Sequence, residues 1–72
     1  MNIPKITSEQ IKWSVSILGK PAARGLFLGT FQDLRAAGFS KGAARRGAAS
    51  VVHEQAQLHE ERGAAQGVLA FA

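Results

Sequence analysis

Three cations, Lys41, Arg45 and Arg46, follow a short turn near the middle of the chain. Gly38 in this turn can adopt the left-handed conformation that closes one helix, and Ser40 can cap the next helix. The cations then fall in the first turns of that second helix, where the helix dipole already supplies partial positive charge. Carboxylates would stabilise such a helix start and cations do not. The pattern therefore predicts a binding site for an external anion.

The rest of the sequence carries no recognisable reactive chemistry. The serines have no nucleophile elbow or paired base nearby, and the few carboxylates cluster at Glu60 and Glu61. His53 and His59 are six residues apart, so they fall on different sides of a helix rather than at the spacing of a shared metal site. The chain has no cysteine and hence no thiolate ligand. We expect no enzyme activity, no small-molecule substrate, no metal and no other cofactor.

Around the basic turn, the sequence resembles the helix–turn–helix family of DNA-binding proteins. The resemblance covers residues 30–50: a short helix, the turn 37–40, and a second helix that begins with polar and basic residues. It implies that Phe39 is the buried residue that locks the two helices together.

The resemblance also assigns roles to individual side chains. Ser40, Lys41 and Arg45 would approach the DNA first, and Arg35 and Arg46 would contact the flanking phosphates. Phosphate contacts position such a helix, and a bidentate arginine on guanine can supply sequence preference.

Length and composition predict one small domain, residues 1–72, with a thin core. The hydrophobic fraction of 46% is ordinary for a folded chain, but much of it is alanine, which buries little area. A thin core of this kind often depends on a dimer or a larger assembly, so a homodimer is one expectation.

The net charge of +4 is unevenly distributed along the chain. Residues 1–46 hold eight lysines and arginines against two acidic residues, whereas residues 47–72 hold one against three. A basic first part favours an anionic partner, and nucleic acid is the commonest partner of that kind.

Neither a membrane span nor a secretory signal is expected. No apolar run approaches the roughly 20 residues of a transmembrane helix, and the N-terminus lacks the apolar core of a signal peptide. We expect a cytoplasmic protein, or one in the host cytoplasm if it is viral.

The fold class predicted is all-α, a compact domain of three or four helices with a helix–turn–helix-like hairpin and a long C-terminal helix. Thr7 and Gln10 match a capping box and predict a first helix over 8–18, ended by Gly19. The same segment alternates apolar and polar residues over 11–17, which is typical of a strand, and this alternative stays open.

The remaining helices are expected at 21–28 or 31–37, and at 41–62. Gly25 and Gly29 weaken the first of these, so that a short buried strand at 25–29 is an alternative, with Thr30 capping a separate helix after it. In the long helix, Gly47 is a position where a kink could occur.

Both ends of the chain are expected to differ from the helical body. Residues 1–6 are predicted to form an extended arm, because proline at position 4 disfavours helix at the residue before it. Residues 64–72 form an apolar tail, and Val68, Leu69 and Phe71 are expected to bind the core or a partner chain.

Two functions are consistent with these features. The first is a small basic DNA-binding protein of the transcription-regulator type, encoded by a phage or a mobile element. The second is a small accessory or inhibitor protein that binds an acidic or nucleic-acid-binding surface of a host protein. This second expectation rests on size, charge division and the apolar tail.

Overall fold

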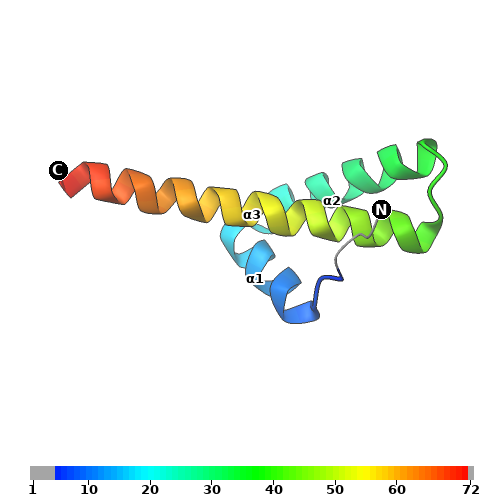
Figure 1. The fold of residues 1–72 in the computed structure, drawn as a ribbon, viewed down its shortest axis with the longest axis horizontal. Coiled ribbons are helices and arrows are strands. Elements are labelled where there is room, and N and C mark those ends of the chain that lie inside the picture. Colours follow the sequence, from blue (N-terminus) through cyan, green and yellow to red (C-terminus); the bar gives the residue numbers. More distant parts are fainter. Residues whose placement is uncertain (1–4, 72) are drawn as a thin grey trace.

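A computed structural model describes residues 5–71, with side chains described as far as residue 63. It contains three helices, α1 (Ser8–Leu18), α2 (Lys20–Ala36) and α3 (Lys41–Phe71). Residues 5–71 contain no strand, so the all-α prediction is confirmed. The strands considered at 11–17 and 25–29 are wrong, because both segments lie inside helices (Figure 1).

Local hydrogen bonds set both ends of α1. The Thr7 N–H donates to Gln10 Oε1 at 2.8 Å, and the Gln10 N–H donates to Thr7 Oγ1 at 3.1 Å, which completes the predicted capping box. Gly19 ends the helix at φ 88°, and its N–H donates to the Val15 carbonyl at 2.8 Å. The structure confirms the predicted helix 8–18, and the cap decides against strand pairing.

The second helix, α2, joins the two segments that the sequence left as alternatives. It continues through Gly25 and Gly29, and Thr30 lies in its interior rather than at a cap. The rings of Phe27 and Phe31 stack with their centroids 6.4 Å apart. Packing along α3 outweighs the cost of two interior glycines, which is about 1 kcal/mol each relative to alanine.

The turn between α2 and α3 has the predicted conformation. Gly38 has φ 98°, its N–H donates to the Arg35 carbonyl, and the Phe39 N–H donates to the Leu34 carbonyl at 3.0 Å. This pair of bonds is a Schellman motif. The Ala43 N–H donates to Ser40 Oγ at 3.2 Å, so the predicted cap of the next helix is confirmed as well.

The expectation that Phe39 is buried is wrong, because its side chain is 43% exposed. The Schellman motif closes the turn through backbone hydrogen bonds, so no aromatic side chain is needed between the helices to hold it.

The third helix, α3, is longer than predicted. It runs without a break through Gly47 and past residue 62 as far as Phe71. Gly47 is buried where the helices pack, which explains why a residue without a side chain does not interrupt the helix. The predicted end near Gly63 is therefore wrong.

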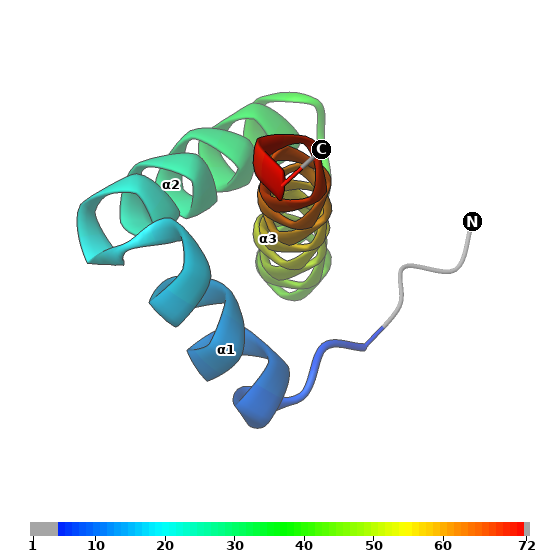
Figure 2. The same ribbon diagram turned by 90° about the vertical axis from the view of Figure 1, so that its left-hand side faces the viewer.

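Helix α3 lies across the open side of a V formed by α1 and α2 (Figure 2). Four of its buried residues, Ala44, Ala48, Val52 and Ala56, recur every four positions, and Gly47 is buried beside them. Ser14 of α1 is also fully buried. A row of small side chains lets helices approach closely, but it leaves the larger apolar side chains at the edges of the contacts. Within residues 5–63, no large apolar side chain is fully buried except that of Val52.

Candidate nucleic-acid interface and apolar groove

The hairpin between α2 and α3 lies at one end of the molecule (Figure 1), and its sequence holds four cations. Arg35 at the end of α2 and Lys41, Arg45 and Arg46 at the start of α3 are all exposed. No acidic residue occurs in the sequence between Asp33 and Glu54. Asp33 in the last turn of α2 offsets one of these four charges, so this end of the molecule carries a net positive charge.

Arg35 is held against the turn rather than extended into solvent. Its Nη1 donates to the Phe39 carbonyl oxygen at 2.9 Å. The guanidinium thus places its charge at the hairpin tip and keeps further N–H donors for an anion.

Arg45 and Arg46 point to different sides of α3. A Cβ atom placed on Gly42 would lie 3.7 Å from Arg46 Nη1, so the Arg46 side chain folds back over the first turn of the helix. Arg45 instead borders a groove between the three helices. We call the surface formed by Arg35, Lys41 and Arg46 the outer basic surface. Arg45 lies between this surface and the groove.

Ser40 has a structural role at this surface. Because its hydroxyl oxygen accepts the Ala43 N–H, it caps α3 at the point where an anion would approach. The hydroxyl can still donate its own proton.

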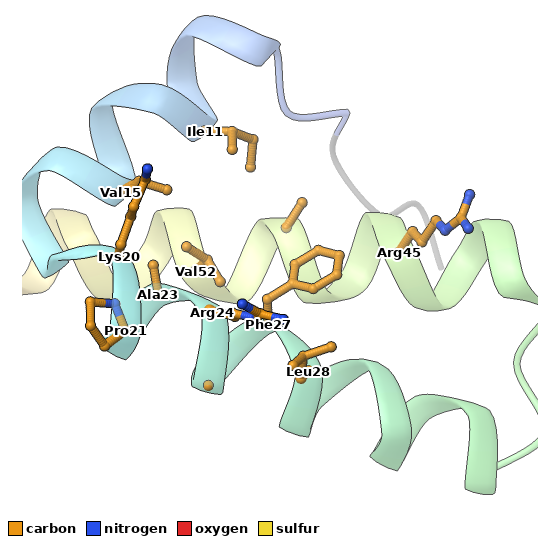
Figure 3. A pocket seen from close by; sticks show the side chains of 12 residues that line it. Ile11, Val15, Lys20, Pro21, Ala23, Arg24, Phe27, Leu28, Arg45 and Val52 are labelled. Atoms are coloured by element: carbon orange, nitrogen blue, oxygen red, sulfur yellow. The ribbon is translucent and has the colours of Figure 1, made fainter.

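A groove between the three helices has a volume of about 1210 Å³. Ile11 and Val15 of α1, Phe27 and Leu28 of α2, and Val52 of α3 supply its apolar surface (Figure 3).

Cations occur among the groove residues and acids do not. Lys20, Arg24 and Arg45 line it together with the apolar side chains, and the groove residues include no aspartate or glutamate. An occupant would need an apolar surface and negative charge.

This groove was not predicted from the sequence. Its residues come from three separate helices, so no spacing within one helix reveals it. The alanine-rich composition gives only an indirect indication of the groove, because a thin core leaves large apolar side chains partly exposed.

The histidines have no metal-binding arrangement. The His53 ring packs edge-on against Trp13, with centroids 5.7 Å apart and an interplanar angle of 62°, and His59 is exposed. Residues 5–63 hold no group of three histidine, aspartate or glutamate side chains placed to share an ion. Trp13 is 38% exposed and covers the α1–α3 contact rather than filling a core.

The predicted partner-binding residues Val68, Leu69 and Phe71 lie outside the described side chains; the backbone at these positions continues α3. None of the described helices has both the length and the apolar character needed to cross a membrane. Comparisons of the chain with protein-family models, with curated proteins and with solved structures found no match.

Proposed function

We propose that this chain is a small DNA-binding protein that contacts phosphates with the basic end of the α2–α3 hairpin. The observation that carries the proposal is the run from Leu34 to His53, which holds four cations and no acidic residue and folds into one helical hairpin. The first turn of α3 adds exposed N–H groups and the positive end of the helix dipole.

The charges alone set the expected salt dependence. If Arg35, Lys41, Arg45 and Arg46 each neutralise one phosphate, the slope of log K against log salt is about −3.6. Affinity then falls about 150-fold between about 50 mM and 200 mM salt. A hairpin that only presents a solvated basic surface would show no measurable duplex binding at either concentration.

The test is fluorescence anisotropy with a short mixed-sequence duplex, measured over this salt range. Lys41→Ala/Arg46→Ala should weaken binding and reduce the slope by about 1.8, because two counterion-releasing contacts are lost. The matched control is Lys5→Ala/Lys12→Ala, which removes the same charge from exposed positions before and on α1.

The substitution Ser40→Asp should change the stability of the protein and its affinity for DNA in opposite directions. Aspartate caps a helix as well as serine does and places a carboxylate at the positive end of α3, so stability should rise by about 0.3–1 kcal/mol. The same carboxylate would repel phosphate, and DNA binding should weaken. Absence of duplex binding at low salt, or equal losses in the control and K41A/R46A, would contradict the proposal.

A further inference from the structure

The side chains around the groove restrict the kind of ligand that can bind there. Three cations, Lys20, Arg24 and Arg45, are its polar side chains, and the other lining residues are apolar or glycine. Within the described part of the chain, neither a neutral polar side chain nor an acidic one lines the groove. A ligand rich in hydroxyl or amide groups would leave those groups without hydrogen-bond partners, which disfavours its binding. The groove therefore fits a ligand with an apolar body and an anionic group.

Two of the three cations are placed to hold one anionic group together. Lys20 and Arg24 are four residues apart on α2, so they lie on the same face of the helix. In Figure 3, Lys20 points from α2 toward Val15 of α1, whereas the Arg45 guanidinium points away from the apolar side chains. Lys20 and Arg24 are therefore the pair that would bind a carboxylate.

The apolar side chains form a path of defined length beside this pair. The groove residues of α2 run from Lys20 to Leu28, which is about 12 Å at 1.5 Å per residue. Ile11 and Val15 of α1 and Val52 of α3 border the same space (Figure 3). With C–C bonds of about 1.5 Å, an extended chain of about ten to twelve carbons spans about 11–14 Å. A hydrocarbon chain of this length matches the apolar path.

The groove narrows toward Gly19. Helix α1 ends at Leu18 and α2 begins at Lys20, so Gly19 alone separates the two helices, which diverge from this point (Figure 3). A partner helix with its side chains is about 10–12 Å across and is too wide for this end of the groove. An acyl chain is one carbon atom wide and can follow the groove to its narrow end.

We propose that the groove binds a long-chain fatty acid, with the carboxylate held by Lys20 and Arg24. The acyl chain lies between the two arms of the V and covers Val15, Phe27 and Leu28, of which Leu28 is 44% exposed without a ligand. Burial of this apolar surface supplies the binding free energy, and the two cations fix the orientation. The proposal does not depend on DNA binding, because neither cation belongs to the basic hairpin.

The experiment is isothermal titration calorimetry of the full chain with dodecanoate, kept below its critical micelle concentration. Wild type should bind one dodecanoate per chain. Affinity should fall for each two methylene groups removed from the ligand, by about fifteenfold where they are fully buried. Dodecyltrimethylammonium has the same chain and the opposite charge, and it should bind wild type at least about tenfold more weakly.

A charge reversal tests the position of the carboxylate. Lys20→Glu/Arg24→Glu should weaken dodecanoate binding at least about tenfold and strengthen binding of dodecyltrimethylammonium, because the charges at this end of the groove are exchanged. The gain for the cationic ligand shows that the variant keeps a folded groove. Lys5→Glu/Lys12→Glu, which reverses two exposed charges outside the groove, is the matched control and should change neither affinity.

A second pair of variants tests the apolar path. Leu28→Glu places a carboxylate in the groove and should weaken dodecanoate binding, whereas Leu58→Glu makes the same change at an exposed position of α3 outside it and should not. Equal affinity for the two amphiphiles, equal losses in K20E/R24E and its control, or no dodecanoate binding by wild type would overturn the proposal. If only an acidic amphipathic helical peptide binds wild type, and K20E/R24E abolishes that binding, the groove is a protein-docking site instead.

Discussion

Because small side chains on α3 allow the helices to pack closely, we expect a larger side chain in this row to lower the free energy of unfolding. Ala48 is fully buried at the centre of this row. Ala48→Leu adds three carbon atoms where the helices approach closely, and overpacking of this kind typically costs about 1–3 kcal/mol. A domain of 72 residues has a total unfolding free energy of about 4–11 kcal/mol, so the change removes a substantial part of it.

Thermal and urea unfolding followed by circular dichroism measure this effect. For a domain of this size, each kcal/mol lowers Tm by about 4–8 °C. Ala22→Leu is the matched control, because it makes the same chemical change at an exposed position of α2 and should leave stability within about 0.5 kcal/mol. If A48L unfolds at the same temperature as wild type, the small side chains do not set the spacing of the helices.

Backbone and capping changes give two further predictions for the same unfolding assay. Gly29→Ala should stabilise the protein by about 0.5–1 kcal/mol, because the helical backbone accepts alanine and no atom lies within 4 Å of the added Cβ. Gly38→Ala should instead destabilise the protein by about 1 kcal/mol or more, because an L-residue is strained at φ 98°. Equal effects of Gly29→Ala and Gly38→Ala on stability would contradict this reasoning. Thr7→Ala should cost about 1 kcal/mol through loss of the capping box, whereas an unchanged Tm would show that α1 does not need its cap.

Local signals predicted both ends of α1, the end of α2 and the start of α3, whereas the predicted end of α3 near Gly63 was wrong. The caps at Thr7 and Ser40 and the turns at Gly19 and Gly38 each depend on hydrogen bonds between residues at most five positions apart. Such bonds form wherever the residue types and spacing are right, so a sequence pattern is sufficient evidence for them.

Features that depend on packing between helices were predicted less well. Gly25 and Gly29 indicated a break in α2, but contact with α3 keeps the helix continuous. Phe39 was expected in the interior and is 43% exposed, because backbone hydrogen bonds close the turn without its side chain. The cations of the candidate site were identified from sequence, whereas the divergence of Arg45 from Arg46 and the groove itself required the arrangement of all three helices.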